Sequence, residues 1–276
     1  MRKICRPFFL SPVLLFLFLL LPFPALAETL KIVAGTSLIE DIVRDLTSGR
    51  VEMITLMPGS HCPGQDDVKA SDFVFAAGAD LALLHAFQRT MPQVAGMLEA
   101  VEGSGLRRVI LESGGSWLIP EVQKQAVRDI AAALAAAAPE QAGEIGERAG
   151  RRLLRIDRAG GESLARLAAV RDQAVIASAM QAEFLRWAGL RLAGTYGRAE
   201  ELTPGGIARL IDELRGRPLL GVVDNYQSGA EAGLPLALEL GVPHAVLSNF
   251  PGSSEDVPDY FSLLRHNVDQ LIRLGE

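Results

Sequence analysis

Short apolar runs alternate with helix-forming segments on both sides of a middle stretch that contains helix-forming sequence only. In the first half, strands are predicted at 30–34, 51–56, 81–84 and 108–111, with helices at 38–46, 71–77 and 91–100. In the second half, strands are predicted at 174–177, 190–195, 219–223 and 244–247. Strands that alternate with helices form parallel sheets, because each parallel connection crosses back over the sheet. The pattern predicts an α/β fold with two parallel-sheet lobes.

The stretch from 121 to 171 separates the two predicted lobes. It is rich in alanine from 126 to 138 and then carries Arg, Glu and Leu at helical spacing. Pro139 is placed to begin a second helix, and a helix can bend or end at Gly160 and Gly161. We predict a long, rigid helical connector between a lobe at 28–120 and a lobe at 172–276, with the ligand cleft between the lobes.

The first 27 residues have the parts of a signal peptide. A basic start at Arg2 is followed by an apolar run and by the small-residue cleavage site Ala25-Leu26-Ala27. The unbroken apolar part, 13–21, is shorter than the roughly 20 residues that span a bilayer. We expect cleavage near Glu28 and a mature protein that is periplasmic or otherwise extracytoplasmic.

Charge and cysteine content narrow the function. The whole sequence has a formal net charge of −6, and loss of the basic signal segment makes the mature chain more acidic. Nucleic acid is not an expected partner, because binding it needs a basic surface. Cleavage also removes Cys5, which leaves Cys62 alone and excludes an internal disulfide. A lone exported cysteine is either a small buried residue or a functional thiol.

The loop that reads MPGSHCPGQDDVKASD, from Met57 to Asp72, concentrates metal-binding side chains. An imidazole, a thiolate and carboxylates suit Zn²⁺ or another late divalent ion. Parallel sheets bind ligands beyond the carboxyl ends of their strands, so a residue after a strand of the second lobe can complete the site. The predicted metal ligands are His61, Cys62, Asp66, Asp67 and Asp224. Other polar residues expected in the cleft are Gln65, Ser178, Asn225, Gln227 and Asn249.

Two histidines near strand ends and the two tryptophans are not included among the predicted metal ligands. His85 ends a predicted strand near the cleft, where it is either an outer ligand or a buried, hydrogen-bonded histidine. His244 begins a strand and is expected at the end far from the cleft. Trp117 and Trp187 are expected to fill the lobe cores, since their apolar neighbours have packing spacing.

The order of several segments resembles the solute-binding proteins of zinc and manganese ABC importers. KIVAGTSLIEDIVRDL, AGADLALLHAF, the tryptophan loop at 114–120, FLRWAGL and TPGGIARLIDEL follow one another in that order. The resemblance covers nearly the whole mature chain. It implies two α/β lobes joined by a rigid helix, a transition metal ion (Zn or Mn) as transported cargo, and delivery to an ABC-transporter membrane permease by a monomer.

The ligand positions of that family lack their usual residues here. The family's first histidine falls at Gly64 or Gln65, and the second falls at Gly115. The third ligand, a His or Glu, falls at Ser178 or Ala179, and the family's aspartate falls at Ser248 or Asn249. The His-rich insertion of many zinc-importing members is also missing.

Three interpretations of these differences stay open. In the first, the site is rebuilt around the predicted ligands. In the second, the cleft binds a chelated metal or a small polar organic solute through amide and hydroxyl groups. In the third, His61 and Cys62 only pack the loop and the cleft holds nothing tightly. A thiol-dependent enzyme using Cys62 is a different class. Adjacent residues rarely align as nucleophile and base, and the sequence has no G-x-S-x-G or H-E-x-x-H motif. No enzyme is predicted.

Overall fold

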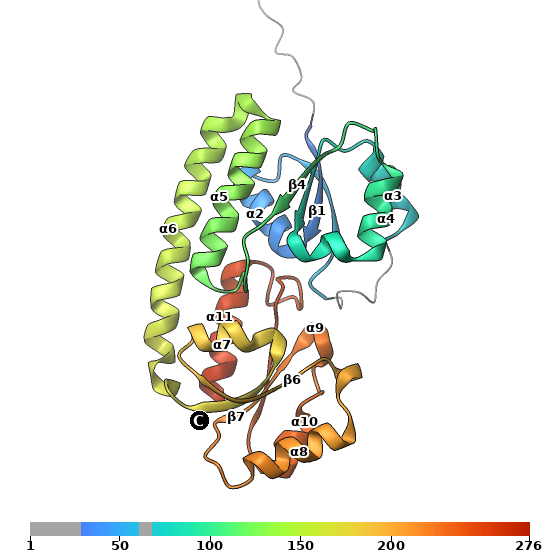
Figure 1. Ribbon diagram of the computed structural model, residues 1–276. Helices are drawn as coiled ribbons and strands as arrows, with labels where there is room; N and C mark the ends of the chain where they lie inside the picture. The colour runs from blue at the N-terminus through green and yellow to red at the C-terminus, as the bar shows by residue number, and fades with distance from the viewer. Residues whose placement is uncertain (1–28, 61–67) are drawn as a thin grey trace, which may run out of the picture.

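The protein has two lobes that are stacked end to end and joined along one side by long helices (Figure 1). The computed structural model describes residues 29–60 and 68–276. Within these ranges, no helix has both the length and the apolar character needed to cross a membrane. The predicted α/β fold with two parallel-sheet lobes is confirmed.

The first lobe contains a parallel sheet in the order β2-β1-β3-β4. Its strands are β1 (Lys31–Thr36), β2 (Glu52–Met57), β3 (Leu81–His85) and β4 (Arg107–Leu111). Its helices are α2 (Ser37–Thr47), α3 (Ala70–Ala77), the 3₁₀ turn η2 (Ala86–Thr90) and α4 (Pro92–Ala100). Ile32 packs with α2, whereas Val33 packs with α3 and α4, because successive strand residues face opposite sides of a sheet.

The second lobe repeats this plan with the order β6-β5-β7-β8, again all parallel. Its strands are β5 (Ala174–Ser178), β6 (Arg191–Tyr196), β7 (Gly221–Asn225) and β8 (His244–Leu247). Its α-helices are α7 (Ala182–Trp187), α8 (Pro204–Leu214), α9 (Tyr226–Gly229), α10 (Leu234–Leu240) and α11 (Tyr260–Arg273). The 3₁₀ turns η4 (Ala168–Val170), η5 (Ala179–Gln181) and η6 (Ala199–Glu201) precede β5, α7 and α8, respectively.

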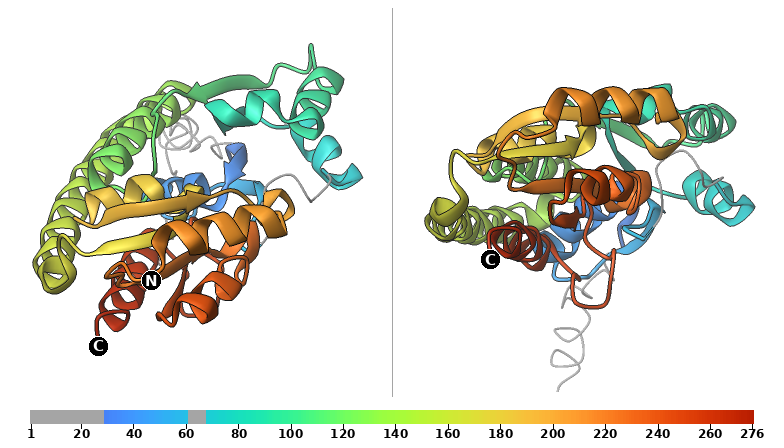
Figure 2. Two further views of the ribbon diagram at one scale, coloured as in Figure 1. Left: turned by 60° about the horizontal axis from the view of Figure 1, so that its bottom comes forward. Right: turned by 90° about the horizontal axis from the view of Figure 1, so that it is seen from below.

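The connector is a helical hairpin rather than a single rod. Helix α5 (Pro120–Ala137) runs along the first lobe, the 3₁₀ turn η3 (Pro139–Gln141) reverses the chain, and α6 (Ala142–Leu167) runs back to the second lobe (Figures 1 and 2). Helix α6 continues through Gly160, where an added Cβ would lie 2.8 Å from Pro120 Cγ. Glycine at this position therefore lets α6 approach the start of α5 closely.

Local capping signals account for several helix ends. The side chain of Thr203 accepts a hydrogen bond from Gly206 N at 3.1 Å and so caps the start of α8, and Gly241 ends α10 in the left-handed conformation. The predicted helix at 71–77 differs from the structure at its start. Helix α3 begins one residue earlier, because Asp72 accepts a hydrogen bond from Lys69 N at 3.0 Å and so makes Lys69 the N-cap.

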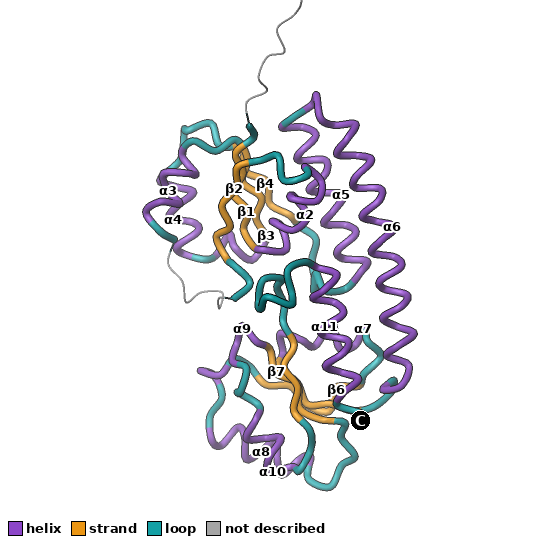
Figure 3. The backbone as a smooth tube through the Cα atoms, turned by 180° about the vertical axis from the view of Figure 1, so that it is seen from behind, coloured by secondary structure: helices purple, strands orange, loops and turns teal. Residues whose placement is uncertain are grey.

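The loop between β8 and α11 reaches the first lobe (Figure 3). Ser37 Oγ donates a hydrogen bond to Pro251 O at 2.7 Å, and Gln227 Nε2 donates one to Gly59 O at 2.8 Å. An added Cβ at Gly59 would lie 1.9 Å from Pro251 O, so only glycine allows this approach. The two lobes are therefore in direct contact on one side of the cleft.

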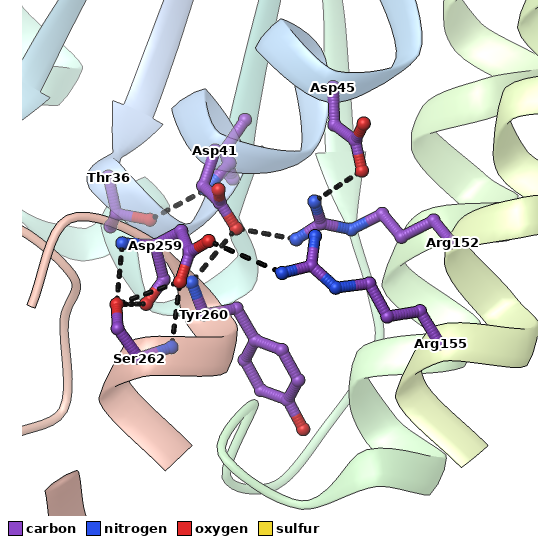
Figure 4. A network of polar contacts seen from close by, with 9 residues as sticks. Thr36, Asp41, Asp45, Arg152, Arg155, Asp259, Tyr260 and Ser262 are labelled. Carbon is purple, nitrogen blue, oxygen red and sulfur yellow. Dashed lines mark hydrogen bonds and ion pairs between the residues drawn. The ribbon is translucent and has the colours of Figure 1, made fainter. Parts of the chain in front are cut away.

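A buried ionic network joins α2, α6 and α11 (Figure 4). Arg152 on α6 is 3% exposed and pairs with Asp41 at 2.5 Å and with Asp45 at 2.8 Å. Asp41 also accepts a hydrogen bond from Tyr260 N at 3.2 Å, at the first residue of α11. Since α2 belongs to the first lobe and α11 to the second, the network fixes the lobes to the connector and to each other.

Candidate functional site

A pocket of about 440 Å³ lies between the lobes. The first lobe and the start of the connector contribute residues after β3, β4 and at the start of α2, while the second lobe contributes residues after β5 and β8. Its lining includes His85, Phe87, Gly115, Trp117, Ala179, Met180, Glu183, Asn249 and Phe250. The pocket is thus at the carboxyl ends of strands from both sheets, where parallel α/β folds bind ligands.

His85 ends β3 and forms part of an aromatic wall of the pocket. Its Nε2 lies 2.8 Å from Thr36 Oγ1, and its ring centroid is 4.0 Å from Trp117 and 5.2 Å from Phe87. Burial lowers the pKa of His85 to about 3, because the charged form would lose its hydration. His85 is therefore neutral at physiological pH and adds no positive charge to the pocket.

Three positions where the family resemblance places metal ligands line this pocket: Gly115, Ala179 and Asn249. Gly115 and Ala179 have no donor atom in their side chains. The Oδ1 atom of Asn249 accepts a hydrogen bond from Gln181 Nε2 at 3.0 Å. Within 29–60 and 68–276, no group of three or more His, Cys, Asp or Glu side chains is placed to hold a metal ion.

Glu183 on α7 is a pocket residue that the sequence interpretation missed. Its Oε2 accepts a hydrogen bond from Ser116 N at 2.6 Å, and an added Cβ at Gly115 would lie 3.2 Å from the same oxygen. Among the described residues that line the pocket, Glu183 alone has a carboxylate. The sequence does place Glu183 five residues after the end of β5, at the edge of the sheet where parallel α/β folds bind ligands.

The predicted polar cleft residues in the second lobe form two small groups. Ser178 Oγ lies 3.5 Å from Ser228 Oγ, which donates to Asn225 Oδ1 at 3.1 Å. Gln227 Nε2 donates to Gly59 O, and Gln227 Oε1 accepts from Asn249 N at 3.0 Å. Gln227 therefore fastens Gly59, near the start of the donor loop at 57–72, to the second lobe.

The structure places Asp224 away from the pocket. Its buried carboxylate accepts hydrogen bonds from Tyr196 OH at 2.7 Å and from Gly233 N at 2.9 Å, and lies 2.6 Å from His244 Nε2. Asp224 alternates with Asn225 along β7 and shares the face of Val222, which packs with α8 and α10. Burial and then the Asp224 charge raise the pKa of Tyr196 well above its usual range. To bind a metal, Asp224 would have to leave these partners.

The remaining predicted ligands lie outside the described residues. These are His61, Cys62, Asp66 and Asp67, together with the cleft residue Gln65. Their role as ligands therefore stays a prediction. Trp117 both packs in the core and lines the pocket, with Nε1 donating to Ser113 O at 3.0 Å, whereas Trp187 is half-buried and stacks on Phe184 at 5.4 Å between ring centroids.

Comparison with known families identifies the class of protein. The family model "Zinc-uptake complex component A periplasmic" (ZnuA) matches residues 32–274. The chain belongs to this family, and the resemblance inferred from its sequence is confirmed. No curated protein matches the chain closely enough to indicate a relative.

Solved structures show the same fold at low sequence identity. The Mn-bound periplasmic metal binding protein from Candidatus Liberibacter asiaticus matches with a TM-score of 0.76 and 14% identity, over 90% of this chain and 100% of that one. Its Cd-bound form also matches with a TM-score of 0.76, at 15% identity over 90% and 100% of the two chains. The periplasmic zinc binding protein TroA from Treponema pallidum matches with a TM-score of 0.76 and 17% identity, over 90% and 99%.

Proposed function

We propose that this protein is the extracytoplasmic solute-binding receptor of an ABC importer. In this role it captures a divalent transition metal ion, of the zinc or manganese type, and delivers it to a membrane permease. The observation that carries the proposal is the pocket shared by the two lobes, because three family ligand positions meet there in a chain of the ZnuA family. The similar structures named for bound manganese, cadmium and zinc support a divalent ion as cargo.

The proposed metal ligands are His61, Cys62 and one or both of Asp66 and Asp67. The described residues supply no group of three such donors, so a tightly bound ion needs donors from 61–67. Gly59, two residues before His61, is bonded to Gln227 of the second lobe. This contact brings the start of the donor loop to the inter-lobe cleft. Asp224 is left out of the proposed set because its oxygens are hydrogen-bonded inside its own lobe.

The proposed transport cycle begins with export and removal of residues 1–27. The ion is then captured in the cleft with a small lobe adjustment, since the α5–α6 hairpin and the Arg152 network resist a wide opening. Cleft-side surfaces of both lobes then dock on the permease. Binding and release carry this function, and no catalytic step is needed.

The test is the metal content of the mature chain. The chain from residue 28 is purified without chelators, and bound metals are measured by elemental mass spectrometry. We expect close to one divalent ion per chain, lost in both His61→Ala and Cys62→Ser and kept in His266→Ala, which changes a histidine on α11 outside the pocket. A parent chain that binds neither Zn²⁺ nor Mn²⁺ after refolding with each ion would overturn the proposal.

A further inference from the structure

The inter-lobe pocket has apolar walls that a bare metal ion does not use. Phe87 from the first lobe is 47% exposed and Met180 from the second is 44% exposed, and both line the pocket. Large apolar side chains left open on two sides of one cavity are typical of a ligand-binding surface. Trp117 and Phe250 extend the same lining. The pocket is therefore complementary to an apolar surface.

The pocket also has a net negative charge. Glu183 supplies a carboxylate, of which Oε2 accepts a hydrogen bond from Ser116 N. His85 is neutral, so no described lining residue supplies a cation. The exposed ring of Phe87 favours a positive charge as well, because aromatic ring faces carry negative potential. A positively charged solute fits this combination better than a neutral or anionic one.

Volume and donor content argue against a bare ion as the only occupant. A cavity of about 440 Å³ is within the roughly 300–1,000 Å³ of small-molecule sites. A divalent ion needs about four or more close donors, and the described residues place no such group here. A bare ion held by other residues would leave most of this cavity to water.

We infer that this pocket binds a small cationic solute with an apolar outer surface. Such a solute is either an organic cation or a divalent metal ion enclosed by an apolar, ring-containing chelator. The apolar surface packs on Phe87, Met180 and Trp117, and Glu183 balances the charge. This inference rests on the proposed receptor function, because it names the class of solute that the same cleft takes.

Isothermal titration calorimetry on the mature chain tests the inference with four probes. Benzyltrimethylammonium represents the organic cation, and Zn²⁺ with 2,2′-bipyridine represents the chelated metal. Neopentylbenzene is the neutral isostere of the first probe, and Zn²⁺ alone tests the proposed receptor function by itself. Binding of the ammonium or of the zinc complex supports the inference, and the probe that binds identifies the source of the charge.

Variants assign the binding to the pocket. Glu183→Gln is expected to weaken binding of the cationic probe by about 3- to 5-fold, as for an exposed ion pair. Phe87→Ala is expected to weaken it by about 3- to 10-fold through loss of apolar and cation–π contact. The matched controls are Glu239→Gln and Leu238→Ala, two exposed positions on α10 outside the pocket, and each should change affinity less than about 2-fold.

Three results would overturn the inference. They are no binding of either cationic probe, equal binding of neopentylbenzene and benzyltrimethylammonium, and binding that is unchanged in both Glu183→Gln and Phe87→Ala. If Zn²⁺ alone binds while both cationic probes fail, the receptor proposal stands and only the inference about the solute is lost. If a cationic probe binds and Zn²⁺ alone does not, the pocket is real and the bare-ion proposal is lost.

Discussion

Replacing Arg152 with methionine tests whether the buried network fixes the two lobes. The guanidinium of Arg152 is the partner of Asp41, whose side chain is only 13% exposed. Burial raises the pKa of Asp41, and the neighbouring Arg152 partly offsets this effect. Methionine fills much of the same volume but leaves the carboxylate of Asp41 without its charged partner.

The expected loss of stability can be worked out from the two ion pairs. Breaking the buried pair with Asp41 costs about 3–5 kcal/mol, because one charge stays buried and unpaired. The pair with Asp45, whose side chain is 42% exposed, adds less than about 1 kcal/mol. For a chain of this size, a loss of about 3 kcal/mol corresponds to a melting temperature about 6–12 °C lower.

Urea unfolding followed by circular dichroism measures this loss. Arg151→Met is the matched control, since Arg151 lies on the same helix and its pair with Glu147 at 3.8 Å is exposed. The control should lose less than about 0.5 kcal/mol. Adding Asp41→Asn to Arg152→Met should restore part of the loss, because the unpaired charge is removed. An Arg152→Met protein as stable as the Arg151→Met control would refute the reasoning.

Three further outcomes are expected. His85 has a pKa of about 3 in the folded protein against an ordinary 6.5, so the unfolded chain takes up the proton first as the pH falls. The contribution of His85 to the free energy of unfolding should therefore drop by about 2 kcal/mol from pH 6 to 4.5. This part of the pH dependence should vanish in His85→Gln. Gly59→Ala should lower stability by about 1–3 kcal/mol by pushing Pro251 away, whereas Gly96→Ala, in the open interior of α4, should be neutral or stabilising in the same thermal melts. Asp224→Asn should cost about 1–3 kcal/mol through its network with Tyr196 but keep the metal content of the parent; metal loss with unchanged stability would contradict the described network.

The fold was predictable because its signals are local and repeated. Each predicted strand has a counterpart in the structure, because apolar runs of four to six residues between helical segments are typical of buried strands. Thr203-Pro204 at the start of α8 and Gly241 at the end of α10 are local signals of the same kind. The packing of the connector into a hairpin was not, because it depends on contacts such as Gly160 with Pro120 that no local pattern encodes.

The site was less predictable because it depends on which way side chains point. Asp224 and Asn225 are consecutive residues at the end of β7, so their side chains point to opposite faces of the sheet. Only the tertiary packing identifies which of these faces is covered by helices. Glu183 has the sequence context of an ordinary surface residue in a helix. Its role depends on Ser116, which is 67 positions away in the chain.

The most direct test of the proposed metal site is X-ray absorption at the zinc edge of the Zn²⁺-loaded mature protein. The account predicts one sulfur neighbour at about 2.3 Å, from Cys62, together with nitrogen and oxygen neighbours at about 2.0–2.2 Å. In Cys62→Ser the sulfur neighbour should disappear. A spectrum with nitrogen and oxygen neighbours only, unchanged by Cys62→Ser, would contradict the proposed ligand set.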